Sequence, residues 1–384
     1  MDGEPANIAA TKQALIVQLK DLCFKYMQDL DYASARSALA KLIELDKEDI
    51  DTQLLFAKLV EDGDRSYLPT EINSADFLIV GADSRVGSAI ETKFLVDGRR
   101  CIGTTRRHPT PAGRIYLDLS DPPKSWRLPD HCDVTFLLAG ITSLAQCEAE
   151  PELTRQVNVN RTIELARMLG ARCSQVIYIS TNLVFSGDVP DVDAYSALSP
   201  QCHYARQKAE VEQTLMESGM PVSIVRVTKV AETLRDLLWS WAVDLIQDRP
   251  IRPFSDLVCA PCSMDDLINS LIRIGDIRKT GLFQLGGGPD IRYDEIARRL
   301  AQSLNVSQEL VRPTTSIAAG VNLPAKPRYT TMQTAPRDMQ HELPAVHSDV
   351  AIGMVVNDVT RTILKSSVLG KYYLKPPVMA AVGF

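Results

Sequence analysis

The first 65 residues carry apolar side chains at the spacing of α-helices. Between residues 11 and 62 there is no strand-like alternation of apolar and polar residues. Apolar residues instead recur every three or four positions, which is typical of helices with one buried face. Two such faces are Ala14, Leu15, Leu19, Leu22, Cys23 and Tyr26, and then Ala35, Ala38, Leu39, Leu42 and Ile43. The pattern predicts a short all-α unit over residues 1–65, followed by a polar linker.

Beyond the linker, strand-type and helix-type segments alternate. Apolar runs typical of strands lie at residues 76–80, 99–107, 114–119, 133–140, 175–180 and 221–227. Helical spacing is found in the intervening segments 88–97, 152–169 and 203–219. This alternation predicts an α/β protein built on a Rossmann-type, doubly wound parallel sheet.

The pattern becomes less regular in the C-terminal third. Helices are expected at residues 233–247, 263–275 and 292–304, separated by loops and by a short strand at residues 281–286. These elements predict a smaller C-terminal substrate lobe, mainly residues 229–335, within a domain that spans residues 66–335. Residues 336–384 are expected to form a C-terminal extension, to which the pattern assigns no role.

Composition excludes several classes of partner. Of the 384 residues, 45% are hydrophobic and 23% are charged, and the net charge is −6. A chain with this charge has no general affinity for nucleic acid or anionic membranes. No apolar run approaches the roughly 20 residues that span a bilayer, and the start, MDGEPANIAA, lacks the apolar segment of a secretory signal. We therefore expect a cytoplasmic protein without nucleic-acid or membrane partners.

The eight cysteines are scattered along the chain. In a long chain without a signal peptide, such cysteines are expected to be reduced thiols. Cys259 and Cys262 form a C-x-x-C pair, but a structural zinc site needs four ligands and no second pair lies at suitable spacing. We therefore expect no metal site.

The first strand of the sheet runs into GADSRVGSAI, residues 81–90, which has the outline of a nucleotide-binding turn. Gly81 allows a tight turn, and Gly87 allows the following helix to pack closely on the strand. The start of that helix, with Arg85 and Val86, would present N–H groups and a positive dipole end to a pyrophosphate. Ser84 stands where a glycine is usual, and its hydroxyl can donate to a phosphate oxygen. The alternative is a turn with a purely structural role.

The second strand ends in GTTRR. At this place in a Rossmann fold an acidic residue binds the ribose hydroxyls of NAD, whereas an arginine accommodates the 2′-phosphate of NADP. Arg106 and Arg107 therefore favour NADPH, with NADH as the alternative, unless both side chains are simply solvated. Asp118 and Leu119 follow the third strand and are expected to face the adenine.

Three residues in the second half suggest carbonyl chemistry. Tyr204 and Lys208 are four residues apart and therefore share one face of a helix. A lysine cation beside a tyrosine lowers the pKa of the phenol from about 10, and Thr181 at a strand end can hold a carbonyl oxygen. Together they suit a reductase in which the tyrosine delivers a proton and a nicotinamide delivers hydride. Taken singly, each of the three also has an ordinary structural interpretation.

These motifs resemble those of the extended short-chain dehydrogenase/reductases, and most closely those of dTDP-4-dehydrorhamnose reductases and their sugar-nucleotide-binding relatives. The resemblance covers residues 76–333 and is carried by GADSRVG, AGITSLAQCEAEPELTRQVNVN, YISTNLVFSGD, SPQCHYARQKAEVE, VSIVRVTKV, GLFQLGGG and LPAKPRYTT. It implies that Thr181, Tyr204 and Lys208 form the catalytic trio, and that Tyr204 and Lys208 also contact the cofactor.

The same resemblance bears on the substrate. It implies that the loop of Ala139 and Gly140 lies near the nicotinamide, and that the substrate is a nucleotide-linked 4-keto-sugar. Asn182 and Leu183 stand where the family has aspartate and tyrosine, and Ser84 departs from the family's glycine. These departures leave the trio intact and leave the identity of the sugar open.

Residues 15–47 loosely resemble one tetratricopeptide repeat followed by a capping helix. A single repeat cannot bury a continuous core, so it would pack on the main domain, pair with a second copy, or bind a protein partner. A simple helical appendage is the alternative. Two functions therefore stay open: an NAD(P)H-dependent reductase, and a catalytically silent NADP-binding scaffold or regulatory subunit that acts through the N-terminal helices.

Overall fold

The computed structural model describes residues 15–23, 25, 26, 34, 35, 38, 39, 41, 42, 74–108, 110, 114–334, 336, 339, 343 and 346–368. The chain forms two compact units, Met1–Thr135 and Phe136–Phe384. None of the helices in the described ranges is long and apolar enough to cross a membrane.

The central element is a sheet of seven strands in the order β3-β2-β1-β4-β5-β6-β8. The strands are β1 (Ser74–Val80), β2 (Cys101–Thr105), β3 (Arg114–Tyr116), β4 (His131–Leu137), β5 (Cys173–Thr181), β6 (Val222–Val227) and β8 (Gly281–Leu285). The pairs β1–β2, β2–β3, β5–β6 and β6–β8 are all parallel. The predicted Rossmann-type parallel sheet is confirmed.

In the first unit, the helix α4 (Arg85–Val96) follows β1 and packs on it through Ile90 and Phe94. Three successive strand residues, Leu78–Val80, are fully buried. Burial of consecutive residues is what a parallel strand covered on both faces requires. Phe94 stacks on Phe77 with 4.3 Å between the ring centroids.

The described part of the N-terminal segment has a small core of its own. Residues 15–23 are helical, and Ile16, Leu19 and Cys23 are buried together with Ala35, Ala38, Leu39 and Leu42. Leu15 and Leu22, which the sequence pattern placed on the buried face, are 43% and 38% exposed. The buried face is therefore rotated toward Ile16, a residue that the predicted face did not include. The rest of the predicted repeat lies outside the described residues.

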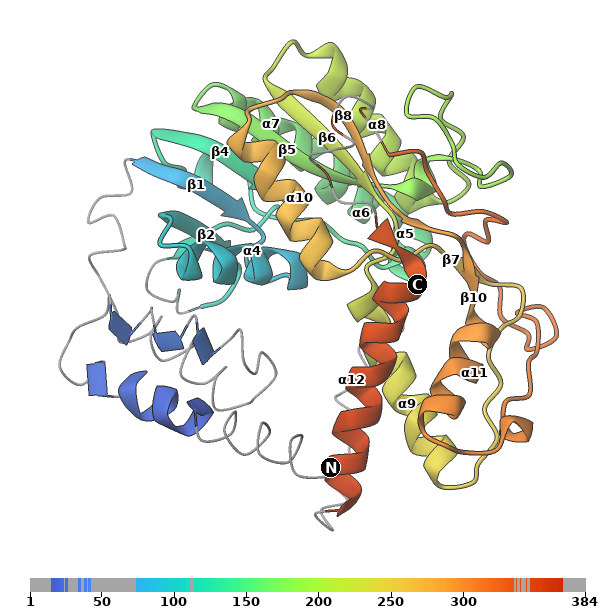
Figure 1. Ribbon diagram of the computed structural model, residues 1–384. Helices are drawn as coiled ribbons and strands as arrows, with labels where there is room; N and C mark the ends of the chain where they lie inside the picture. The colour runs from blue at the N-terminus through green and yellow to red at the C-terminus, as the bar shows by residue number, and fades with distance from the viewer. Residues whose placement is uncertain are drawn as a thin grey trace. The chain divides into compact units, whose positions relative to one another are not determined.

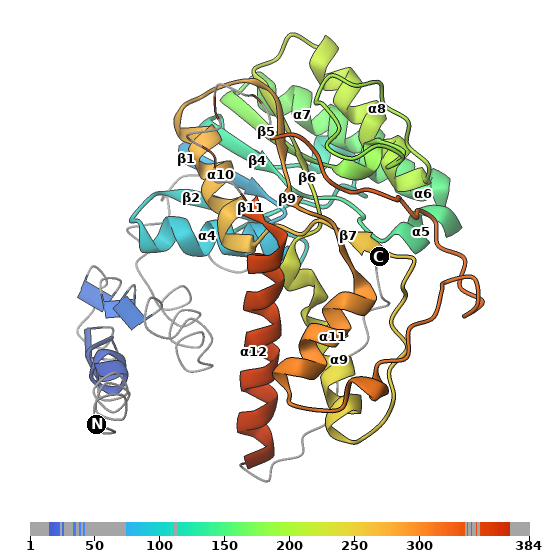
Figure 2. The same cartoon turned by 45° about the vertical axis from the view of Figure 1, so that its right-hand side comes forward.

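In the second unit, α7 (Thr162–Gly170) and α8 (His203–Glu217) pack on β5, and α10 (Met264–Asp276) lies on the other side of the strands (Figures 1 and 2). The shorter helices α5 (Leu144–Ala149) and α6 (Pro151–Arg155) precede α7. The sequence predicted one helix over residues 152–169. The structure interrupts it with a π-helical turn at Gln156–Arg161.

A second core lies away from β5, β6 and β8, where α9 (Arg235–Ile246), α11 (Tyr293–Ser303) and α12 (Ser348–Val368) meet (Figure 1). Two small ladders border it, β7 (Val258–Cys259) with β10 (Ile291–Arg292), and β9 (Gly287–Gly288) with β11 (Val346–His347). The sequence assigned β8 and α10 to this lobe, but β8 is an edge strand of the main sheet. That assignment is corrected.

A buried ion pair joins the helix α8 to the sheet. The guanidinium of Arg226 on β6 donates to both carboxylate oxygens of Glu212 on α8 at 2.6–3.1 Å. Its remaining nitrogen donates to the carbonyl of Ala194 at 2.7 Å and to Gln284 on β8 at 3.3 Å. The two charged side chains are only 4% and 2% exposed. Such a pair is tolerated inside a protein because both charges and nearly all their hydrogen-bonding positions are satisfied.

Breaking this pair is expected to destabilise the protein strongly. Glu212→Gln leaves the Arg226 charge buried without its counter-ion, which should lower the free energy of unfolding by about 3–5 kcal/mol. The matched control is Glu210→Gln on the same helix, which removes a half-exposed partner of Arg155 and should cost about 0–1 kcal/mol. Urea denaturation of the three proteins measures both values. Equal losses in the two variants would contradict the structural role of the buried pair.

Candidate functional site

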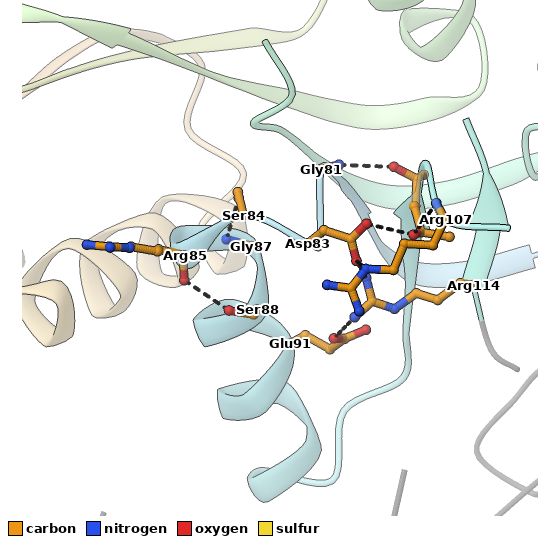
Figure 3. Close-up of polar contacts among 11 residues, drawn as sticks. Gly81, Asp83, Ser84, Arg85, Gly87, Ser88, Glu91, Arg107 and Arg114 are labelled. Carbon is orange, nitrogen blue, oxygen red and sulfur yellow. Dashed lines mark hydrogen bonds and ion pairs between the residues drawn. The ribbon is translucent and has the colours of Figure 1, made fainter. Parts of the chain in front are cut away.

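The turn between β1 and α4, which Figure 3 shows with its polar contacts, is too tight to admit a side chain at Gly87. A Cβ at Gly87 would lie 2.3 Å from the carbonyl oxygen of Gly81 and 2.8 Å from the Cα of Ala82. Gly81 has a φ of 92°, a conformation that favours glycine. Its N–H donates to the Thr104 hydroxyl on β2 at 3.0 Å. Both positions therefore favour glycine on steric or conformational grounds, and the start of α4 lies close against the end of β1.

Ser84, the residue in place of the middle glycine, is the N-cap of α4. Its backbone is extended, and its hydroxyl accepts a hydrogen bond from the Gly87 N–H at 3.0 Å. Serine at an N-cap stabilises a helix by satisfying one of the first N–H groups. Serine at position 84 therefore has a local structural role as a helix cap. Its hydroxyl also uses the Gly87 N–H, which is then not available to bind an anion. The neighbouring side chains of Arg85 and Val86 are exposed and half-buried.

A carboxylate that the sequence did not indicate lies at the end of β2. Asp83, in the glycine turn, accepts a hydrogen bond from the Thr105 hydroxyl at 2.6 Å. The same carboxylate lies 3.8 Å from Arg107 Nε and 3.6 Å from Arg114 Nη1. Arg107 is thus not simply solvated, although its side chain is 72% exposed. Arg106 is exposed.

Asp118 and Leu119 lie just beyond β3. The Asp118 carboxylate accepts a hydrogen bond from the Ser120 N–H at 2.8 Å, and its backbone carbonyl accepts one from the Trp126 indole at 2.8 Å. Leu119 is buried. Asp118 therefore stabilises the turn, and a contact of either residue with adenine stays a prediction.

The predicted catalytic residues belong to the second unit. Tyr204 and Lys208 lie on α8, and Thr181 is the last residue of β5. The Lys208 ammonium donates to the carbonyl of Ile179 on β5 at 2.8 Å. It also lies 5.9 Å from the ring centroid of Tyr204 and 4.5 Å from that of Tyr178. The structure thus brings Lys208 to both the tyrosine and the strand that ends in Thr181.

Burial dominates the protonation of this group. It raises the pKa of Tyr204, and the neighbouring Cys147 and Cys202 thiols raise it further. Burial lowers the pKa of Lys208 to about 8, an effect that Glu212, four residues further along α8, partly opposes. The lysine was expected to lower the pKa of the tyrosine. The structure shows the reverse shift, because burial disfavours the phenolate and the neighbouring thiols add to that effect.

The residue that follows Thr181 lines a small pocket with a volume of about 10 Å³. The hydroxyl of Thr181 accepts a hydrogen bond from the Leu183 N–H at 3.2 Å. Asn182, the next residue, lines the pocket and donates to the carbonyl of Thr330 at 3.4 Å. Pro327 and Tyr329–Met332 also line the pocket, and they belong to residues 327–332, which we call the strap.

The strap is held by hydrogen bonds to several other segments of the chain. Arg328 and Tyr329 donate backbone N–H groups to the carbonyl of Gly187 at 3.0 and 2.9 Å. A Cβ at Gly187 would lie 2.2 Å from that of Pro327, so the approach requires glycine. Asp290 accepts the N–H of Thr330 at 3.0 and 3.1 Å. The wall of the pocket is therefore fixed by the backbone carbonyl of Gly187 and the carboxylate of Asp290, which lie far apart in the sequence.

Asn158 was not singled out from the sequence. It lies buried in the π-helical turn and binds both polar groups of the Ile141 backbone, accepting from its N–H at 2.7 Å and donating to its carbonyl at 2.9 Å. It also donates to Gln207 on α8 at 2.8 Å. The loop of Ala139 and Gly140, half-buried and exposed respectively, is held in this way. A π-helical turn is not readable from helical periodicity, so no sequence signal marked this residue.

Lys229 was also missed. It follows the end of β6, the strand whose Val227 pairs with Thr181 in the sheet register. Among the residues that the structure describes, its ammonium has no hydrogen-bond or ion-pair partner. Burial lowers the pKa of Lys229, and the neighbouring Cys259 thiol opposes the shift. Asp290, which holds the strap, acts on the same thiol. Lys229 is thus an unpaired cation near the residues that anchor the pocket wall.

Comparison with known proteins identifies the family of this chain. The RmlD substrate binding domain family matches residues 75–360. The chain belongs to this family. A curated relative, the dTDP-4-dehydrorhamnose reductase of Mycobacterium tuberculosis, is 24% identical over 252 residues, which cover 63% of this chain and 80% of that protein. Methionine adenosyltransferase 2 subunit beta of Rattus norvegicus is 24% identical over 185 residues, which cover 44% of this chain and 53% of that protein.

Solved structures share the RmlD-family fold. The dTDP-4-dehydrorhamnose reductase of Yersinia enterocolitica superposes with a TM-score of 0.60 at 19% identity, over 75% of this chain and 99% of that one. The Bacillus anthracis dTDP-4-dehydrorhamnose reductase, solved in complex with NADP, superposes with a TM-score of 0.59 at 18% identity, over 74% of this chain and 99% of that one. At these identities the likeness establishes the fold.

The cysteines of this RmlD-family chain differ in part from the expectation. Cys132 and Cys173, at the starts of β4 and β5, are disulfide-bonded, so the expectation of reduced thiols is wrong for these two. Cys259 and Cys262 are free and buried, and burial raises the pKa of each to about 12. No group of three or more His, Cys, Asp or Glu residues in the described ranges could hold a metal ion.

Gly87→Ala should distort the turn of this RmlD-family protein. The added Cβ forces α4 away from β1, which should lower the free energy of unfolding by about 1–3 kcal/mol. The matched control is Gly353→Ala on α12, where a Cβ meets nothing within 4 Å and should be neutral or stabilising by up to about 1 kcal/mol. Thermal denaturation compares the two. An unchanged melting temperature in Gly87→Ala would show that the turn is looser than the structure indicates.

The buried Lys208 should give stability a recognisable pH dependence. Below its folded pKa of about 8 the folded protein carries the full cost of burying the cation, and the unfolded chain keeps the proton up to its ordinary pKa of 10.5. Stability relative to Lys208→Met should therefore rise with pH between these values, by about 1 kcal/mol per pH unit. Urea denaturation at several pH values measures the difference. Lys93→Met, at an exposed lysine, should show a flat difference, and a flat profile for Lys208→Met would contradict the shift.

Proposed function

We propose that this RmlD-family chain is an NADPH-dependent reductase of a nucleotide-linked 4-keto-sugar, with NADH as the alternative cofactor. The observation that carries the proposal is the arrangement of Lys208, which contacts β5 and lies beside Tyr204 on α8. A glycine turn of the dinucleotide-binding type precedes these residues in the chain. Relatives named as dTDP-4-dehydrorhamnose reductases, and a neighbour solved with NADP, support the same reaction class.

The residues of the first unit suit a dinucleotide. The absence of a Cβ at Gly87 lets the start of α4 approach β1, and a helix start offers N–H groups to a pyrophosphate. Arg106 and Arg107 are exposed at the end of β2, where this fold receives the ribose. When bound, the nicotinamide supplies the hydride that reduces the carbonyl carbon.

Tyr204 is the proton donor in this proposal. Burial keeps its pKa above the ordinary value, so the hydroxyl holds its proton at neutral pH. The proton passes from the Tyr204 oxygen to the carbonyl oxygen of the sugar, which becomes a hydroxyl group. Thr181 holds that oxygen in place, and the ammonium of Lys208 stabilises the phenolate left on Tyr204.

The sugar is proposed to lie beside Thr181. Asn182 follows Thr181 in the chain and offers an amide to sugar hydroxyls. Lys229 supplies an unpaired positive charge for the diphosphate that links sugar and nucleotide, since it has no partner among the described residues. The presence of asparagine at position 182 in place of the family's aspartate leaves the sugar to be identified by assay.

A second candidate is a regulatory subunit or scaffold in the cytoplasm. Leu15, Val17 and Leu22 on the N-terminal helix are 38–51% exposed, which suits contact with a second copy or a protein partner. One curated relative is named as a subunit of methionine adenosyltransferase. Under this interpretation NADPH binds without turnover. Incubation with NADPH and a panel of 4-keto-sugar nucleotides, followed by product detection, separates the two candidates.

Tyr204→Phe tests the catalytic assignment. It keeps the packing of the ring and removes only the proton, so kcat should fall by about 10²–10⁴-fold with NADPH affinity nearly unchanged. The control is Tyr195→Phe, at a ring that is 78% exposed, which should leave kcat within about twofold of the wild-type value. Steady-state kinetics and NADPH fluorescence titration give the two readouts. Wild-type turnover in Tyr204→Phe would remove Tyr204 from the mechanism.

A further inference from the structure

The acidic residue that the Rossmann rule places at the end of β2 is present in space, although it is absent from β2 itself. The sequence there reads Thr105, Arg106 and Arg107. The carboxylate comes from Asp83 in the glycine turn, whose Oδ2 accepts the Thr105 hydroxyl at 2.6 Å (Figure 3). The Thr105 hydroxyl in turn accepts the Arg107 N–H at 3.1 Å. Asp83 is therefore held at the strand end by its hydrogen bond with Thr105.

Two arginines lie near the Asp83 carboxylate, and they differ in exposure and in their other partners. Arg114 lies 3.6 Å from Asp83, but its other terminal nitrogen forms an ion pair with Glu91 on α4. Arg107 lies 3.8 Å from Asp83 with a side chain 72% exposed, a geometry that contributes little in water. The Asp83 carboxylate thus lies at the strand end between two arginines, and its side chain stays 32% exposed.

In this fold a carboxylate at the end of the second strand accepts a hydrogen bond from the 2′-hydroxyl of NAD, and an arginine accommodates the 2′-phosphate of NADP. Both features occur together in this chain. A carboxylate close to a 2′-phosphate opposes its binding by like-charge repulsion. The same carboxylate is an acceptor that a 2′-hydroxyl can use.

We propose that Asp83 is a specificity-determining residue for the dinucleotide, which accepts the 2′-hydroxyl of NADH and offsets the preference for NADPH that Arg106 and Arg107 create. The protein therefore binds both dinucleotides with affinities closer together than its two arginines alone would give. This inference rests on the proposed dinucleotide binding. It goes further by assigning selectivity to a residue of the glycine turn.

Asp83→Asn tests the inference. The amide oxygen still accepts from Thr105, and the negative charge is gone. The ratio of dissociation constants, NADH over NADPH, should rise by about tenfold, because NADPH binds more tightly and NADH loses a charged acceptor. Fluorescence titration of the full chain with each dinucleotide gives the ratio without any assay of turnover. Thermal denaturation establishes that the variant is folded.

Two further variants make the outcome specific. Glu91→Gln removes the same charge from the other partner of Arg114 and should leave the ratio unchanged. In an Arg107→Ala background, Asp83→Asn should still raise the ratio, because Asp83 acts on the 2′-phosphate directly. A ratio that stays constant or falls in Asp83→Asn overturns the inference, and so does a gain that vanishes with Arg107→Ala. Failure of the wild-type protein to bind either dinucleotide overturns the proposed function and the inference with it.

Discussion

The buried ion pair between Arg226 and Glu212 is the constraint on which the predicted catalytic face depends. Glu212 lies on α8 one turn beyond Lys208, and Arg226 lies on β6. An ion pair sealed from water has few alternative geometries, since any shift leaves a charge unsolvated. The helix is therefore fixed in rotation and height against the sheet. Tyr204 lies on the same face of α8, so its position also depends on this ion pair, which takes no part in the proposed chemistry.

The turn at residues 81–87 shows how far a local departure from a familiar pattern can be understood. The serine that replaces the middle glycine caps the helix, and the glycine that follows it is required by backbone contact. The turn therefore combines a close backbone approach that requires glycine with local hydrogen bonds accepted by the side chains of Asp83 and Ser84. Binding of a nucleotide at this turn stays a prediction.

Sequence patterns predicted the parallel sheet and placed Thr181, Tyr204 and Lys208 on a strand end and a helix face. They succeeded there because hydrophobic periodicity reports burial directly. They did not predict that the Asp83 carboxylate lies at the end of β2. The rule for that position considers only residues that follow the second strand, whereas Asp83 belongs to the turn after β1. They also failed for Asn158, since a π-helical turn breaks the periodicity. The pKa of Tyr204 was misjudged because burial is a property of the folded chain.

The helical lobe draws its core from three widely separated segments. The helices α9, α11 and α12 share it, and α12 contributes Ile352, Val356 and Val359. During synthesis on the ribosome, α9 and α11 emerge more than 50 residues before the middle of α12. The apolar faces of α9 and α11 that pack on α12 are therefore exposed until α12 has been synthesised. Exposed apolar surface of this kind makes a nascent chain prone to aggregation. The lobe is a late-completing structure, and its apolar helices are candidates for chaperone contact until α12 arrives.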